Sequence, residues 1–384
     1  MAHIYLDNAA TTRMAPAVID VMQTAMTNTF GNASTPNFYG HQAKATLEQS
    51  RHLIAQSINA HDEEIIFTSG GSEGDNTALI TTALSRQKQG HHIISTTIEH
   101  EAVLKTLQFL ESIGFEVTYL PVNDQGQIEI ADLKAALRPD TILVSVMMVN
   151  NEIGTINPIA QIGALLKDYP VVFHTDAVQA YGLLDIDVQA LQVDLLTTSA
   201  HKLNGPKMMG FMYERQGLNL PAFIHGGDQE SKRRAGTENV PAIAGFAEAV
   251  KLHDPTMKSQ TRQRLQQYKS LLLGTLKQAG VQFQINGLQD ISQAAPHILN
   301  IRIANVATDL LQMKLDLAGF IVSGGSACTA GSLEPSHVLQ ALYSPSDPRI
   351  QESIRISFDT YTTQDEVQQF AQALQEIAVN QQKG

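Results

Sequence analysis

The only cysteine in this 384-residue chain, Cys328, lies in the stretch SGGSACTAGSLEP, residues 323–335. Free cysteines are usually buried as small hydrophobic residues, whereas this one stands among glycines, serines and alanines. Small residues give a segment conformational freedom, and chemically active side chains are common on loops. Cys328 is therefore a candidate nucleophile rather than a structural thiol.

A lysine and an aspartate follow apolar runs that are typical of buried strands. Lys202 lies in SAHKLNGPK and Asp176 in HTDAVQ. Either residue alone is as easily explained, the lysine as a surface residue and the aspartate as a turn or capping residue. At the end of a buried strand, however, a partly desolvated amine has a lowered pKa and suits Schiff-base chemistry. A carboxylate ending the preceding strand can pair with the protonated ring nitrogen of pyridoxal phosphate (PLP), which keeps that ring an electron sink.

Three other motifs could bind parts of a ligand. SGGSE (69–73) opens a helical pattern, so it is either a capped turn or an anion site at a helix N-terminus. It lacks the Gly-Lys-Ser/Thr of a P-loop and the GxGxxG of dinucleotide binding. His100 is either a surface histidine or a group that stacks on a cofactor ring and moves protons. Arg355, inside the apolar run SIRISF, needs a carboxylate partner, which is either an internal acid or the carboxylate of a substrate.

The elements that must position these residues alternate from about residue 60 to 215. Short apolar runs alternate with helical patterns, which indicates an α/β protein with a mostly parallel sheet and helices on both faces. Because ligands of such sheets bind beyond the carboxyl ends of the strands, we expect the polar residues that follow the runs to meet at one edge. The expected strands are 65–70, 91–97, 116–122, 141–150, 171–177, 195–201 and 209–214, with helices at 103–113 and 159–169.

The pattern changes near residue 254. Residues 261–280 indicate a long amphipathic helix, and a final helix begins near Asp365. Between them lie three expected strands, at 297–303, 320–325 and 353–358. We interpret residues 256–384 as a smaller α+β domain that carries the cysteine segment.

Composition excludes several functions. Lys and Arg total 26 against 38 Asp and Glu, a formal net charge of −12 without basic clusters, which argues against nucleic acid or an anionic membrane as a partner. One cysteine cannot form an internal disulfide, a cysteine-only zinc site or an iron–sulfur cluster within one chain. The N-terminus does not resemble a signal peptide and no run is long enough to cross a membrane, so we expect a cytoplasmic protein.

The chain resembles the cysteine desulfurases of the class V aminotransferase family (NifS/IscS-like). This resemblance implies PLP fold type I, with a large cofactor domain over residues 16–255 and a small domain formed by residues 1–15 with 256–384. It also implies a homodimer, and SGGSACTAGSLEP resembles the branch with an extended cysteine loop. The matching stretches, in family order, are YLDNAATT, FTSGGSEGDN, IEHEAV, VNNEIG, HTDAVQ, SAHKLNGPK, GGDQESKRRAGTENV, SGGSACTAGSLEPSHVL and SIRISF.

The resemblance also implies a role for each matching residue. Lys202 corresponds to the lysine that forms the Schiff base with PLP, Asp176 to the partner of the pyridinium nitrogen, and His100 to the residue stacked on the ring. Cys328 corresponds to the catalytic cysteine and Arg355 to the clamp of the substrate carboxylate. The other cofactor-binding positions are Gln179 and Asn151, near the ring oxygen and the substrate; Gly71, Ser72, Ser199 and His201, for the phosphate; and Thr237, a phosphate contact for the partner subunit.

The chain departs from the family pattern at a few positions. Ser72 stands where threonine is frequent, Arg13 where proline is frequent, and Asn37 where many members have histidine. The chain ends at Gly384, earlier than members with a longer C-terminal tail. These differences leave substrate entry and docking to a scaffold protein open.

The reaction implied by the resemblance converts L-cysteine to L-alanine and leaves a persulfide on Cys328. The sulfur would pass to an acceptor protein of iron–sulfur cluster assembly or of tRNA or cofactor thiolation, which the sequence does not identify. Because Cys328 must meet first the substrate and then the acceptor, we expect residues 326–334 to be poorly ordered without substrate. Two alternatives stay open: an aminotransferase or lyase of the same fold that uses no protein thiol, and a sulfur-trafficking scaffold or regulator without turnover.

Overall fold

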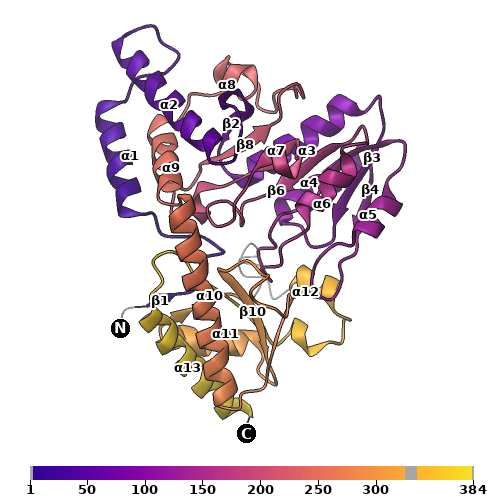
Figure 1. Cartoon of the computed structure of the whole chain (residues 1–384), viewed down its shortest axis with the longest axis vertical. Helices are drawn as coiled ribbons and strands as arrows, with labels where there is room; N and C mark the ends of the chain where they lie inside the picture. The colour runs from indigo at the N-terminus through magenta and orange to yellow at the C-terminus, as the bar shows by residue number, and fades with distance from the viewer. Residues whose placement is uncertain (1–2, 325–334, 383–384) are drawn as a thin grey trace.

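A computed structural model describes residues 3–324 and 335–382. Its upper part in Figure 1 is built on a seven-stranded sheet of order β2-β8-β7-β6-β5-β3-β4. All neighbouring strands are parallel except β8, which is antiparallel to both β7 and β2, so the predicted mostly parallel sheet is confirmed. The strands are β2 (Ile65–Thr68), β3 (His92–Thr96), β4 (Glu116–Leu120), β5 (Thr141–Ser145), β6 (Val172–Asp176), β7 (Leu195–Thr197) and β8 (Gly210–Glu214).

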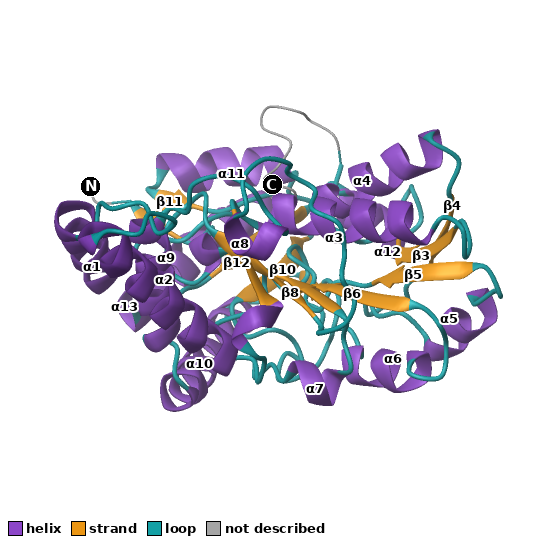
Figure 2. Ribbon diagram, turned by 90° about the horizontal axis from the view of Figure 1, so that it is seen from above, coloured by secondary structure: helices purple, strands orange, loops and turns teal. Residues whose placement is uncertain are grey.

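Helices cover both faces of this sheet, as Figure 2 shows. Helices α3 (Gly71–Arg86) and α4 (Glu101–Ser112) lie on one face, and α5 (Ile130–Ala136), α6 (Ile159–Leu166) and α7 (Val188–Leu191) lie on the other. Side chains alternate along a strand, so neighbours in β3 enter different cores: Ile93 packs in the cluster of α3 and α4, and Ile94 in the cluster of α6. Both faces of the sheet are therefore buried.

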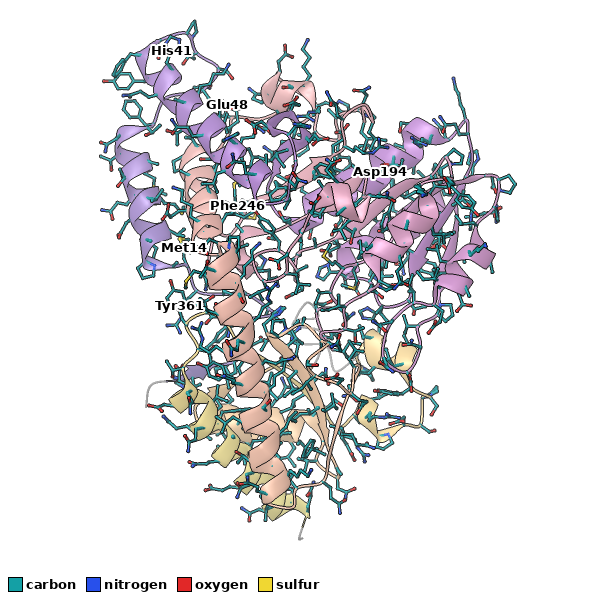
Figure 3. The ribbon with its side chains drawn as sticks, in the orientation of Figure 1. Met14, His41, Glu48, Asp194, Phe246 and Tyr361 are labelled. Atoms are coloured by element: carbon teal, nitrogen blue, oxygen red, sulfur yellow. The ribbon has the colours of Figure 1, made fainter. Side chains whose placement is uncertain are left out.

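A third group of helices packs against the antiparallel edge of the sheet. It consists of α1 (Pro16–Asn28), α2 (Phe38–Gln56) and α9 (Val240–Lys251), and Arg51 of α2 forms hydrogen bonds with Glu230 of α8 (Gln229–Lys232). Phe246 of α9, labelled in Figure 3, makes ring contacts with Tyr181 and Phe211 in the core below it.

The lower part of the molecule has its own sheets and its own core. A three-stranded antiparallel sheet has the order β12 (Ser353–Ser357), β10 (Ile298–Ile303), β9 (Phe283–Ile285). The N-terminal strand β1 (Ile4–Tyr5) pairs in parallel with β11 (Phe320–Ile321), and Leu6 is buried in the same core as residues from 265 to 378. The helices here are α10 (Pro255–Gln278), which runs between the two parts, α11 (Thr308–Leu317), α12 (His337–Leu342) and α13 (Gln364–Gln382).

Each strand and helix expected from the sequence is present, with shorter ends in places. The expected strand 141–150 ends at Ser145, although the N–H groups of Val146 and Met148 still bond to the carbonyls of His174 and Asp176. The expected strand 195–201 ends at Thr197, because Ala200–Lys202 form the 3₁₀ helix η2. Two other 3₁₀ helices are η1 (Asp62–Glu64) and η3 (Pro348–Ile350). The domain boundaries at residues 15 and 255 stay a prediction.

No helix in the described ranges combines the length and the apolar character that crossing a membrane requires.

Candidate active site

A cavity of about 300 Å³ lies where β2, β3, β6 and β7 end, opposite the N-terminal segment and β12. Thr237 does not line it, and its predicted contact in a partner subunit stays a prediction. Cys328 and the segment 326–334 lie outside the described residues. The other predicted site residues all line the cavity: Gly71, Ser72, His100, Asn151, Asp176, Gln179, Ser199, His201, Lys202 and Arg355.

One end of the cavity is formed by the N-terminus of α3. Gly70 has a φ of 145°, a conformation that side-chain-bearing residues rarely adopt, and it directs the chain from β2 into the helix. A Cβ atom on Gly71 would lie 2.9 Å from Cγ2 of Val178, so the backbone approaches the cavity wall closely. The turn is fixed by Glu73, whose carboxylate accepts from the N–H of Ser69 (2.8 Å) and from Arg234 (2.9 Å). The first N–H groups of a helix have no acceptor within the helix and attract anions.

Two polar residues from the loop after β7 lie at the same end. Ser199 and His201 face the start of α3 across the cavity, with Ser199 Cβ 4.0 Å from the Cβ position of Gly71. Burial and then the charge of Lys202 lower the pKa of His201 to about 4, so its imidazole is neutral at pH 7. A neutral donor and a serine hydroxyl complete a site for a phosphate group.

Three buried acids lie beneath the cavity on the sheet side. Asp176 ends β6 and accepts from the N–H of Val178 (2.8 Å); burial raises its pKa, against the charges of His100 and Lys202. Burial and then Asp176 raise the pKa of Asp75, on α3. The pKa of Glu99 rises from 4.5 to about 8, again through burial first. One oxygen of Asp75 has no hydrogen-bond partner in the described part of the chain and lies 3.6 Å from Nε2 of His174. These acids are buried and lie close to one another, so the region favours a cationic group in the ligand.

Lys202 lies at the end of η2, and the N-terminal segment covers its amine. Its Nζ donates to the carbonyls of Ala9 (2.5 Å) and Ala10 (2.8 Å). The same segment is attached to the η2 region by the N–H of Thr12, which donates to the carbonyl of His201 (2.9 Å). The chain that begins near β1 therefore forms a wall of the cavity directly over the lysine.

Arg355 enters the cavity from β12 and is almost fully buried, with 1% of its surface exposed. Its guanidinium donates to Asp7 (2.7 Å) and to the carbonyl of Asn151 (3.0 Å). Of the two partners considered from the sequence, the internal acid is present. The Nε group has no hydrogen-bond partner among the described residues, so one donor remains for a ligand oxygen. Both backbone polar groups of Arg355 pair with Ser323, where the cysteine segment begins.

His100 is the N-cap of α4. Its Nδ1 accepts from the N–H of Ala102 (3.1 Å), so the proton of the neutral ring is on Nε2. The ring lines the cavity on the same side as the buried acids. The hydrogen bond from Ala102 fixes the orientation of the imidazole toward the cavity.

Comparison with known proteins decides the family. The family model for aminotransferase class V matches residues 4–370. The chain belongs to this family. A protein of Bacillus subtilis (strain 168) is 47% identical over 377 residues, which cover 98% of this chain and 99% of that protein. The cysteine desulfurase IscS of Dictyoglomus turgidum is 42% identical over 374 residues, 97% of this chain and 94% of the relative.

Two solved structures have the same architecture. A NifS-like protein superimposes with a TM-score of 0.91 at 34% identity, covering 98% of this chain and 100% of the other. A structure described as SspA in complex with cysteine superimposes with a TM-score of 0.82 at 35% identity, covering 94% and 99%. The predicted PLP fold type I is therefore confirmed.

The cofactor of this class V aminotransferase chain is PLP, and the residues of the cavity fit its three functional groups. The start of α3 with Ser199 and His201 suits the phosphate, and the lack of a side chain at Gly71 lets the start of the helix pack against Val178 in the cavity wall. Asp176 suits the protonated ring nitrogen, and the amine of Lys202 suits the aldehyde. Beyond the predicted set, five residues complete the wall: Ala9, Ala10, Asp75, Met147 and Val178.

One of these additional residues carried a signal in the sequence. Asp75 is four positions after Gly71, and residues four apart lie on the same face of a helix. A helix that opens at Gly71 therefore carries Asp75 on the face of Gly71, a signal that the sequence prediction of the site did not use. Ala9 and Ala10 act through backbone carbonyls, which residue types do not reveal.

Proposed function

We propose that this class V aminotransferase chain is a cysteine desulfurase that converts L-cysteine to L-alanine and leaves a persulfide on Cys328. The observation that carries the proposal is one cavity that combines an amine, a buried carboxylate and an arginine. The backbone of this arginine pairs with the residue at which the cysteine-bearing segment begins. Lys202, Asp176 and Arg355 line it, and Ser323, five positions before Cys328, pairs with the backbone of Arg355.

The side chains of the cavity divide the chemistry between them. PLP, when bound, supplies an electron sink that stabilises negative charge on the substrate Cα. Asp176 maintains the ring nitrogen in its protonated state. Lys202 takes the proton from Cα, and the imidazole of His100 moves protons beside the ring. The donor at Nε of Arg355, together with Asn151, orients the substrate carboxylate.

The sulfur step requires Cys328 as a thiolate. Its sulfur attacks the sulfur of the substrate, so an S–S bond forms while the Cβ–S bond breaks and its electrons return to the carbon skeleton. The skeleton then takes up protons and leaves as alanine, and the protein retains one extra sulfur atom. An ordinary thiol has a pKa of about 8.5 and is only a few per cent ionised at pH 7, so His100 or the bound substrate must assist its ionisation.

The proposal also covers the oligomeric state, the domain division, the sulfur acceptor and the cellular compartment. The protein acts as a homodimer in which Thr237 of each subunit contacts the phosphate held by the other, and each subunit divides into a large domain over 16–255 and a small one over 1–15 and 256–384. The persulfide passes to an acceptor protein of iron–sulfur cluster assembly or of tRNA or cofactor thiolation. The fold needs no oxidising compartment, since one cysteine forms no internal disulfide, and we place the reaction in the cytoplasm.

The test compares alanine formed with sulfur bound to the protein. With L-cysteine, the PLP-loaded protein should form a persulfide on Cys328, detected by mass spectrometry, and alanine in equal amount in the first turnover. Lys202→Ala should lower alanine formation by at least about a hundredfold, whereas the exposed Lys207→Ala should not. If Cys328→Ser still releases sulfide at the wild-type rate, the persulfide step is wrong. Pyruvate or keto-acid exchange without persulfide would identify the lyase or aminotransferase alternative instead.

A further inference from the structure

A buried histidine from the lower part of the molecule contacts the cavity wall. His297 directly precedes β10, and 6% of its surface is exposed. Its Nε2 lies 3.1 Å from the side-chain oxygen of Gln179, which follows β6 and lines the cavity. The Gln179 nitrogen in turn lies 3.0 Å from the carbonyl of Ala9, the same carbonyl that accepts from Lys202.

The carbonyl of Ala9 fixes which group donates and which accepts in each of these hydrogen bonds. A backbone carbonyl can only accept, so the Gln179 group facing Ala9 is the NH₂ and the group facing His297 is the oxygen. His297 must therefore carry its proton on Nε2. Its Nδ1 is buried without a hydrogen-bond partner in the described part of the chain.

The surroundings maintain His297 in this form. Burial, followed by the positive charges of Lys269 on α10, Lys202 and Arg355, lowers its pKa to about 3. The imidazole is therefore neutral across the physiological range, with one N–H, and this N–H is directed at Gln179. The Gln179 amide has two N–H bonds, and Ala9 takes only one of them.

We propose that His297 is a positioning residue that orients the Gln179 amide, so that its second N–H is available to the ring oxygen of the cofactor. The proposal rests on the function proposed above, in that the ligand of the cavity is PLP. Without the His297 donor, only the Ala9 carbonyl positions the amide, and the second N–H is held less firmly toward the ring oxygen. A donor at that position stabilises negative charge on the ring oxygen, which lowers the pKa of the proton that this oxygen shares with the Lys202 nitrogen.

The experiment follows the visible absorption band of the PLP-loaded protein as a function of pH. His297→Leu should move the midpoint of the titration upward by about one pH unit, a tenfold change in the protonation equilibrium. His297→Gln retains an N–H donor at similar reach and should titrate close to wild type. His297→Phe fills the space of the ring without a donor, and it replaces the leucine variant if that one does not fold.

A matched control separates positioning from a general effect of losing a buried histidine. His253, which is also 6% exposed, bonds to the carbonyl of Ala249 and does not line the cavity, so His253→Leu should leave the midpoint unchanged. The inference is overturned if the donor-free variants titrate like wild type, if His297→Gln shifts as far as they do, or if His253→Leu shifts equally. If the wild type itself forms no titrating band with PLP, the proposed function fails first.

Discussion

The two buried regions that flank the cavity contain ionisable groups of opposite type, acids in one and bases in the other, and burial shifts their pKa values in opposite directions. Beneath the sheet edge lie the acids Asp75, Glu99 and Asp176, whose pKa values are all raised. On the side of α10 and β10 lie the bases Lys269 and His297, whose pKa values are lowered to about 7 and about 3. Burial is the first cause in each case, because a low-dielectric surrounding disfavours any charge.

This contrast shows how the cavity selects the orientation of a ligand. The acidic region gains most from a positively charged group, and the basic region, which includes Arg355, gains most from a carboxylate. A ligand with a cationic ring nitrogen at one end and a carboxylate at the other satisfies both. The charges required for binding are therefore distributed between two parts of the chain that fold around different cores.

The largest expected effect comes from removing the carboxylate that faces the ring. Asp176→Asn retains the shape of the side chain but leaves the ring nitrogen without a negative partner. Loss of one partner from a buried ion pair costs about 3–5 kcal/mol, so we expect alanine formation to fall about a thousandfold. Steady-state rates with L-cysteine measure this effect.

The control for this variant is a carboxylate at the opposite end of the parallel strands, where β7 begins. Asp194, labelled in Figure 3, precedes β7 and accepts from the N–H of Phe173 (2.7 Å), away from the cavity. Asp194→Asn should lower stability without a comparable loss of rate per folded molecule. Equal losses in the two variants would show that Asp176 acts only through stability.

Asp176 of the acidic region was predictable from the sequence, together with other polar residues at the carboxyl ends of the strands, whereas Asp75, which lies on α3, was not predicted. Asp176 ends β6 and His100 and Asn151 closely follow two other strands, so parallel topology alone brought them together. The basic region was not predictable from pattern in the same way. Lys269 lies in a polar helix and His297 before an apolar strand, and only the fold brings His297 to Gln179 of the cavity wall and Lys269 close to His297. The ends of the strands also required the structure, since an apolar run does not show where hydrogen bonding stops.

A smaller effect should appear in the pH dependence of stability on the acidic side. Glu99 has a pKa of about 8 in the folded protein against 4.5 ordinarily, so the folded state retains a proton that the unfolded state releases between these values. Stability should therefore fall as pH rises from 4.5 to 8. Glu99→Gln removes this fall and should raise Tm at pH 8 by about 2–4 °C in the cofactor-free protein.

Thermal unfolding at several pH values measures the slope, with Glu376→Gln on the exposed face of α13 as the control. The control should retain the wild-type slope. A Glu99→Gln curve parallel to wild type between pH 4.5 and 8 would contradict a buried, protonated Glu99.

The smallest effect, and the opposite sign, is expected on the basic side. The pKa of Lys269 is lowered from 10.5 to about 7 by burial, so the unfolded state holds a proton that the folded state has lost between these values. Stability should therefore rise with pH from 7 to 10.5, and Lys269→Met should remove that rise. We expect Tm at pH 7 to rise by about 1–2 °C, because the gain in stability from removing a buried base is partly offset by loss of the hydrogen bond from Nζ to the carbonyl of Ala295 (2.6 Å).

The control is Lys277→Met, which is exposed on the same helix. A rise of stability with pH that persists in Lys269→Met would show that another base titrates in this range. A fall in stability that Glu99→Gln removes between pH 4.5 and 8, and a rise that Lys269→Met removes between pH 7 and 10.5, are the signature that one physical cause, burial, acts on both sides of the cavity.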